Sequence, residues 1–149
     1  MPEQPEAVLA FDFGLKRIGI AAGDTLTATA APRPAAFVTA GGPDWQAITR
    51  EVDALKPRRL VVGAPYNADG TPGALAPAAR RFANELARRF KLPVSMVDER
   101  WSSLEASAAL KARRAGGGRR RIRREDVDSA AAAVILERWL AGESGESLK

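Results

Sequence analysis

The fold of this chain is decided by the stretch VLAFDFGLKRIGI at residues 8–20. Residues 8–13 are apolar or β-prone at nearly every position, which is typical of a central strand covered on both faces. Gly14 follows directly, and a second apolar run at residues 18–22 comes after a tight connection. The stretch therefore predicts a β-hairpin.

Asp12 is the carboxylate that interrupts the first of these strands near its end. Burying an aspartate in an apolar strand is costly unless its oxygens accept hydrogen bonds or bind a cation. One interpretation is that Asp12 caps the turn by accepting hydrogen bonds from nearby backbone N–H groups. The other is that Asp12 binds a cation at a functional site, and this stretch alone leaves both open.

Length and composition indicate one globular domain. The chain has 149 residues, of which 46% are hydrophobic and 28% charged, ordinary values for a domain with a sizeable core. We expect a single domain over residues 1–149, with flexible tails at 1–6 and 142–149. The sequence contains no run of about 18 apolar residues, so we expect no transmembrane helix. The first six residues are acidic and rich in proline, unlike a signal peptide, so we expect a cytoplasmic protein.

Cysteine and histidine are both absent from the sequence. Their absence excludes disulfides, zinc–thiolate sites, imidazole ligands, Ser-His-Asp triads and any histidine acid or base. An enzyme built from this chain must use carboxylates, lysines, hydroxyls or a metal ion held by oxygen atoms. Mg²⁺ and Mn²⁺ are the ions that carboxylate and water ligands suit.

The positive charge of the chain is concentrated in one segment. The formal net charge is +5, from 23 Lys and Arg against 18 Asp and Glu. Residues 111–124 contain eight basic side chains and no acidic one, so this segment accounts for the excess. A clustered basic patch suits a phosphate backbone, because each neutralised phosphate releases counterions. A solvated loop without a partner is the alternative, and we favour nucleic acid.

Amphipathic segments alternate with short apolar runs in the rest of the chain. Asp44 is a plausible N-cap for a helix whose apolar residues from Trp45 to Leu55 recur at spacings of three and four, and Pro57 ends it. Further helices are expected at residues 75–90, from Ser102 or Ser103 to Arg113, and from Glu125 or Asp126 onward. Further strands are expected at residues 25–34, 60–63 and 93–97, with a loop at 41–43.

This order of elements predicts an α/β fold with a mixed central sheet and helices on both of its faces. Three acidic clusters lie at element boundaries: Asp12, Asp98-Glu99 and Glu125-Asp126-Asp128. The carboxyl ends of strands in such a sheet face a shared crevice. Carboxylates that meet there repel one another unless divalent cations neutralise them. Two such metals, about 4 Å apart, can activate a water and stabilise the leaving oxygen in phosphodiester hydrolysis.

The last acidic cluster admits two interpretations. Glu125 and Asp128 are three residues apart and lie on one face of the expected helix. Carboxylates at a helix N-terminus also simply favour the macrodipole, and for Asp126 we prefer that explanation. Residues 130–133 are all alanine, which lets this helix approach the sheet closely.

Four ordered motifs carry a resemblance to a known family. They are FDFGLKRIGI at residues 11–20, VGAPYNADG at 62–70, DERWSSLEA at 98–106 and VDSAAAAVIL at 127–136. Together they resemble the YqgF (RuvX) family over roughly residues 7–141. This resemblance implies a ribonuclease H-like fold and a relation to the RuvC Holliday junction resolvases. The chain departs from the family pattern at Ala64, at Trp101 and in its unusually basic arginine loop.

The resemblance also implies a metal-dependent nuclease with Mg²⁺ or Mn²⁺ as cofactor. Its catalytic metal ligands would be Asp12, Glu99 and Asp128, and Asp98 would orient Glu99 or the strand end. The resemblance implies that Lys16 and Arg17 hold the substrate backbone and that Arg100 binds phosphate or locks the acidic cluster. The basic segment adds Arg119, Arg120 and Arg121 as further nucleic-acid-binding candidates.

Family members are described as nucleases for the 5′ end of precursor 16S rRNA or as Holliday junction resolvases, and we favour the rRNA role. A resolvase cuts two strands symmetrically and usually acts as a dimer. No apolar dimer seam is obvious in the sequence, so we expect a monomer or a weak homodimer. Two further classes stay open. One is an ATPase or sugar-kinase-like protein, because Asp12-x-Gly14 on a hairpin also resembles the phosphate loop of the actin and hexokinase group. The other is a non-catalytic RNA-binding module.

Overall fold

The computed structural model describes residues 6–64, 76–98, 124–141 and 146–148. Its strands are β1 (Ala7–Asp12), β2 (Arg17–Asp24), β3 (Ala30–Thr39), β4 (Gly42–Pro43), β5 (Arg59–Ala64), β6 (Val94–Asp98) and β7 (Glu146–Leu148). Its helices are α1 (Trp45–Leu55), α2 (Ala76–Phe90) and α4 (Arg124–Leu140).

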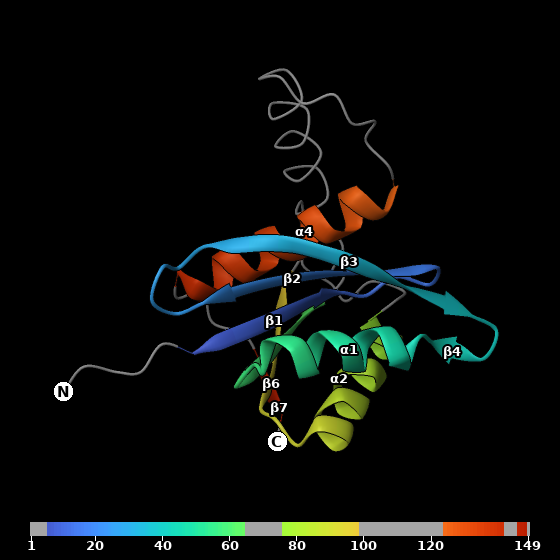
Figure 1. Ribbon diagram of the computed structural model, residues 1–149. Coiled ribbons are helices and arrows are strands. Elements are labelled where there is room, and N and C mark those ends of the chain that lie inside the picture. The colour runs from blue at the N-terminus through green and yellow to red at the C-terminus, as the bar shows by residue number, and fades with distance from the viewer. Residues whose placement is uncertain (1–5, 65–75, 99–123, 142–145, 149) are drawn as a thin grey trace.

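The strands form one mixed, seven-stranded sheet in the order β4-β3-β2-β1-β5-β6-β7 (Figure 1). Strands β1, β5 and β6 are parallel to one another. The hairpin partners β2, β3 and β4 follow one another antiparallel on one side, and β7 is antiparallel to β6 on the other. Helices α1 and α2 cover one face and α4 covers the other. The predicted α/β fold with a mixed sheet and helices on both faces is confirmed.

The alternation of side chains along β1 divides the core into two layers. Leu9 and Phe11 are fully buried in the cluster shared with α1 and α2. Val8 and Ala10 are equally buried but pack on the other face, against Ile135 of α4. Since successive side chains of a strand point to opposite faces, Asp12 lies on the α4 face, in line with Val8 and Ala10. This strand therefore needs apolar residues at every other position on both sides, as its sequence indicated.

The two helices of the first layer begin and pack as their sequences predict. The Asp44 side chain caps α1 by accepting a hydrogen bond from the Ala47 N–H at 3.1 Å. Phe82 of α2 is buried and stacks on Trp45 of α1, with ring centroids 5.5 Å apart. Its ring also meets Phe11 of β1 edge-on at 5.7 Å. One aromatic side chain thus joins both helices to the central strand.

The prediction of a third strand over residues 25–34 is wrong in its boundaries. Residues 25–27 form a turn, in which the Asp24 carboxylate accepts hydrogen bonds from the Leu26 and Thr27 N–H groups. The Thr27 N–H bond is the main cause that holds the pKa of Asp24 below its ordinary value. The strand itself begins at Ala30 and continues past both prolines to Thr39.

The prolines do not end β3 because neither needs a backbone N–H where it lies. Over residues 30–37 the strand pairs only with β2, so the other side of the strand has no ladder to complete. Pro34 falls where the register shifts: Ile18 pairs with Ala36, but Ile20 pairs with Arg33. This β-bulge leaves one extra residue on β3.

Two further expectations differ from the structure. The expected loop at residues 41–43 contains β4, which pairs Gly42 with Thr39 and Pro43 with Val38. The expectation of a flexible tail does not hold for Glu146–Leu148, which form β7 against β6. Pairing with an edge strand satisfies backbone groups that would otherwise be open, and it requires no apolar pattern that a sequence could reveal. The helix expected from Ser102 or Ser103 lies outside the described residues.

The first turns of α4 approach β2 so closely that no side chain fits between them. A Cβ atom placed on Gly19 would lie 1.9 Å from the main-chain oxygen of Asp128 and 2.8 Å from the amide nitrogen of Ser129. Real carbon atoms do not approach a carbonyl oxygen to that distance, so position 19 must be glycine. The buried alanines that follow, Ala131 and Ala132, keep α4 close to the sheet along its length. In the part of the chain that the structure describes, no helix has the length and apolar character to cross a membrane.

Replacing Gly19 by alanine is expected to lower the free energy of unfolding by about 1–3 kcal/mol or more, because α4 or β2 must shift to make room for the methyl group. Urea denaturation measures this loss. The matched control is Gly41→Ala, whose new methyl would meet only the Thr39 hydroxyl at an ordinary 3.8 Å. We expect the control to stay within about 0.5 kcal/mol of the parent. Equal stability of both variants would contradict the tight contact.

Candidate active site

The carboxyl end of β1 brings Asp12 between two glycines. Its cross-strand partner on β2 is Gly19, and its partner on β5 is Gly63. Neither neighbour contributes a side chain beside Asp12. Because β6 is parallel to β1 and β5, Asp98 also ends its strand at this edge, beside Ala64 of β5.

Asp128 reaches the same place from the other end of the sequence. The Asp128 main-chain oxygen lies over Gly19, and Gly19 is the residue directly opposite Asp12. Directly opposed residues of an antiparallel pair have Cα atoms only about 4.5–5.5 Å apart. The structure therefore brings Asp12 and Asp128 to one end of the sheet, on the face that α4 covers.

An ion pair fixes the Asp128 carboxylate. The Arg17 Nε donates to Asp128 Oδ2 at 2.7 Å, and the two side chains are 22% and 28% exposed. Arg17 is the first residue of β2, directly after the hairpin loop that holds Lys16. Lys16 is exposed, and its main-chain carbonyl accepts a hydrogen bond from the Val38 N–H at 2.9 Å. Both were predicted to bind nucleic acid; for Arg17 the structure adds a contact that the sequence did not indicate.

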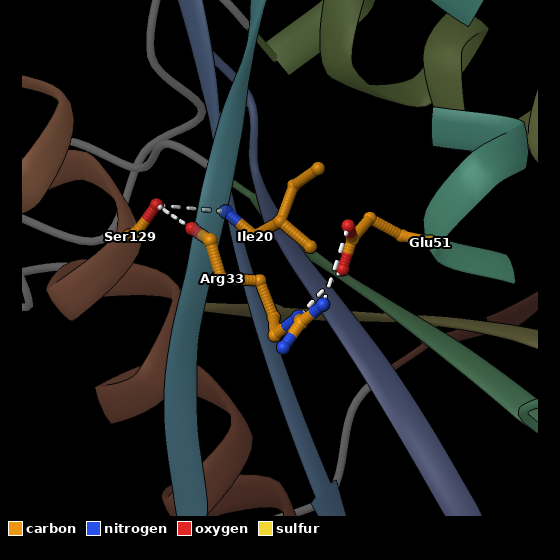
Figure 2. Close-up of polar contacts among 4 residues, drawn as sticks. All are labelled: Ile20, Arg33, Glu51 and Ser129. Carbon is orange, nitrogen blue, oxygen red and sulfur yellow. Dashed lines mark hydrogen bonds and ion pairs between the residues drawn. The ribbon is translucent and has the colours of Figure 1, made fainter. Parts of the chain in front are cut away.

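Ser129 fastens the start of α4 to the sheet at the bulge (Figure 2). Its hydroxyl donates to the Arg33 carbonyl at 2.7 Å and accepts from the Ile20 N–H at 3.3 Å. These are the two backbone groups that face each other where the β2–β3 register shifts. A buried side-chain hydroxyl thus completes the ladder that the bulge interrupts, and it fixes the residue next to Asp128.

Arg33 extends this connection through the sheet to the other layer, as Figure 2 shows. Its Nε lies 2.6 Å from Oε1 of Glu51, a residue of α1 that is only 8% exposed. The hydrogen bond and the charge of Glu51 raise the pKa of the Arg33 guanidinium above its ordinary value. The backbone of one residue therefore holds α4 while its side chain holds α1. The sequence analysis assigned no role to Ser129, Arg33 or Glu51. The one available signal was that Ser129 directly follows the candidate ligand Asp128.

The remaining candidate residues lie outside the described part of the chain: Glu99, Arg100, Arg119, Arg120 and Arg121. The same is true of the Glu125 side chain, whereas Asp126 is half-buried near the start of α4. Within the described ranges, no group of three acidic, histidine or cysteine side chains that could hold a metal ion occurs. Those ranges supply the pair Asp12 and Asp128, which offers oxygen donors alone. That donor chemistry fits Mg²⁺ or Mn²⁺.

Known proteins match most of this chain in sequence. A family model described as "RuvX: Holliday junction resolvase" matches residues 6–142. A protein of Coxiella burnetii is 43% identical over 146 residues, which is 98% of this chain and 100% of that protein. A protein of Salmonella dublin is 44% identical over 108 residues, or 72% of this chain and 78% of that protein. Both are named "Putative pre-16S rRNA nuclease".

Solved structures agree in fold. The Thermus thermophilus RuvC in complex with a Holliday junction substrate superimposes with a TM-score of 0.53, covering 96% of this chain and 99% of that chain. The sequence identity is 16%. A second structure of Thermus thermophilus RuvC gives a TM-score of 0.52 at 15% identity, covering 95% and 99% of the two chains. The likeness confirms the predicted ribonuclease H-like fold.

Arg17→Gln is expected to lower the free energy of unfolding by about 1 kcal/mol in metal-free buffer, because it removes a partly buried, charged hydrogen bond from Asp128. Lys16→Gln, one residue earlier in the loop, is the control and should leave stability unchanged. Urea denaturation distinguishes the two. If Arg17→Gln were as stable as the parent and only weakened nucleic-acid binding, Arg17 would be a phosphate ligand rather than a support for Asp128.

Proposed function

This chain belongs to the RuvX family, and we propose that it is a divalent-metal-dependent nuclease that processes the 5′ end of precursor 16S rRNA in the cytoplasm. The nuclease activity agrees with the names of its relatives and with its ribonuclease H-like fold. The observation that carries the proposal is the approach of Asp128 to Asp12 across Gly19. Like charges at one end of the sheet repel unless cations neutralise them. Arg17 supplies one positive charge to Asp128, and in this proposal a divalent metal supplies the rest.

We propose that Asp12 and Asp128 hold the metal together with Glu99. Glu99 directly follows the last residue of β6 in the sequence, and Val97, two residues before it, packs on the α4 face. When bound, Mg²⁺ or Mn²⁺ would supply an activated water and would stabilise the leaving oxygen of the phosphodiester. In this proposal Arg17 keeps the Asp128 carboxylate in place through Nε.

The basic residues would bind the substrate backbone. Lys16 is exposed on the hairpin loop next to the proposed metal site. We propose two further sources of phosphate ligands. Arg100 is proposed from the family resemblance, and Arg119, Arg120 and Arg121 are proposed from the clustered positive charge of residues 111–124. Phosphate contacts set affinity and position without reading sequence, so these residues do not by themselves distinguish RNA from DNA.

A Holliday junction resolvase is the second candidate. The description of the matching family model and the RuvC complex with its junction substrate favour it. A resolvase would require two copies of the chain to cut two strands symmetrically. The curated relatives that match most of the chain are instead named for precursor 16S rRNA, so we place the rRNA substrate first.

The test is cleavage of a precursor 16S rRNA fragment beside a four-way DNA junction, each with Mg²⁺ or Mn²⁺. We expect cleavage near the mature 5′ end of the RNA and little cutting of the junction. Symmetric cutting of the junction with an intact RNA would replace the first candidate by the second. Cleavage of neither, with retained RNA binding, would indicate a non-catalytic module.

Asp12→Asn is expected to abolish hydrolysis and to leave the fold intact or more stable, because it relieves repulsion between carboxylates. Asp53→Asn is the control, since Asp53 is exposed on α1, on the far side of the sheet, and should keep full activity. Gel-based cleavage and thermal denaturation give the two readouts. Excess chelator should abolish the parent activity as well, and hydrolysis that persists in its presence would remove the metal from the mechanism.

A further inference from the structure

Large apolar side chains that remain exposed in the described part of the chain are Leu15, Leu26 and Phe37. Isolated exposed apolar residues are common on protein surfaces and need no function. Leu26, 73% exposed, lies in the turn after β2 and illustrates this ordinary case. Phe37 of β3 is 53% exposed and pairs with Arg17, the first residue of β2. Strand geometry puts it about 23 Å from the end of β2 that precedes Leu26. Its position, rather than its exposure alone, is informative.

Phe37 lies on the face of the sheet that carries the candidate active site. It pairs directly with Arg17 across the β2–β3 ladder, and directly opposed residues of an antiparallel pair share a face. The next pair, Ile18 and Ala36, belongs to the core shared with α1 and α2, so Arg17 and Phe37 face the other way. The bond from Arg17 to Asp128 of α4 agrees with this orientation.

The backbone that carries Phe37 is fixed on both sides. The Phe37 carbonyl accepts a hydrogen bond from the Asp44 N–H at 3.0 Å, at the cap of α1. The next residue, Val38, donates its N–H to the Lys16 carbonyl at 2.9 Å. An exposed ring on a fixed backbone loses little conformational entropy when a flat ligand packs against it, which favours binding.

We propose that Phe37 is a stacking platform for an unpaired nucleobase next to the scissile phosphate. Its neighbours supply the rest of such a site. Lys16 is an exposed cation one residue before Arg17, the cross-strand partner of Phe37. Asp12 and Asp128 lie beyond Arg17 on the same face of the sheet. Single-stranded nucleic acids bind to aromatic side chains beside cationic backbone contacts, and this stacking tolerates any base. A continuous duplex keeps its bases stacked on one another and cannot use the platform.

This inference rests on the proposed nuclease function and adds a substrate requirement to it. The strand to be cut would need at least one unstacked nucleotide beside the cleavage position. A single-stranded end, a bulge or an opened junction arm would provide it, and the shared chemistry is an unpaired base.

The test measures binding, so that it does not depend on cleavage. Short single-stranded RNAs, each with one 2-aminopurine at a successive position, are titrated against the inactive Asp12→Asn parent in Mg²⁺. We expect quenching of the probe at one position, because stacking on an aromatic ring quenches its fluorescence. Adding Phe37→Ala should remove that quenching and weaken binding about 5- to 140-fold, the equivalent of roughly 1–3 kcal/mol for one stacked base. Phe37→Tyr should restore both, and Leu26→Ala should change neither.

Two altered ligands separate stacking from a general loss of structure. An RNA that is abasic at the quenched position, and a fully paired duplex, should bind the Phe37→Ala variant and its parent equally well. The same set in DNA should give the same Phe37 effect, because the contact is to the base. An unchanged affinity for the normal single strand, or an equal loss for the abasic one, would overturn the proposal. Absence of single-strand binding by the parent would overturn it too.

These outcomes are distinguishable from failure of the nuclease function. Base-dependent binding through Phe37 without any cleavage by the wild-type chain would contradict the nuclease proposal alone. Cleavage of the precursor RNA with no effect of Phe37→Ala on binding would contradict the stacking site alone.

Discussion

The contact between Gly19 and the start of α4 is the constraint on which the rest of the structure depends. A helix can lie with its backbone directly on a strand only where the strand has no side chain, and the Asp128 oxygen occupies the space that a Cβ would need. This contact fixes the height of α4 above the sheet, and the small buried residues along the helix keep it there. Because Gly19 faces Asp12 across the ladder, the same contact also brings the backbones of Asp12 and Asp128 close together.

The β-bulge on β3 allows the sheet to bind α1 as well as α4. Without the extra residue, Arg33 and Ala36 would point to opposite faces, since they are three positions apart. With it, both face α1, and the Arg33 guanidinium reaches Glu51 while its carbonyl remains available to Ser129. Glu51 is the more buried member of this partly buried pair, and its carboxylate would lose its cation if Arg33 faced the other way. The irregularity is therefore part of how the sheet holds helices on both sides.

The sequence was sufficient wherever a local pattern and a local cause coincide. The hairpin after Asp12, the Asp44 cap and the buried face of α2 follow from periodicity and capping, and the structure agrees. The sequence was insufficient where pairing between distant strands determines the bounds or the existence of an element. Pro32 and Pro34 read as a strand end, yet an open edge and a bulge accommodate them, and β7 forms by backbone pairing alone. For the candidate site, Asp12 and Asp128 were recognisable as carboxylates at element ends. The Arg17 contact and the two hydrogen bonds of Ser129 were not, since they join residues 96 to 111 positions apart.

The hydroxyl of Ser129 also has a consequence for how the chain folds. The Ile20 N–H and the Arg33 carbonyl are separated from Ser129 by 109 and 96 residues. During synthesis the β2–β3 hairpin emerges about a hundred residues before the hydroxyl that joins these two backbone groups. Contacts of such long sequence separation are made late and slow the folding of a domain. The Ser129 bridge therefore cannot form before the last helix has been synthesised, and it joins the first and last parts of the chain.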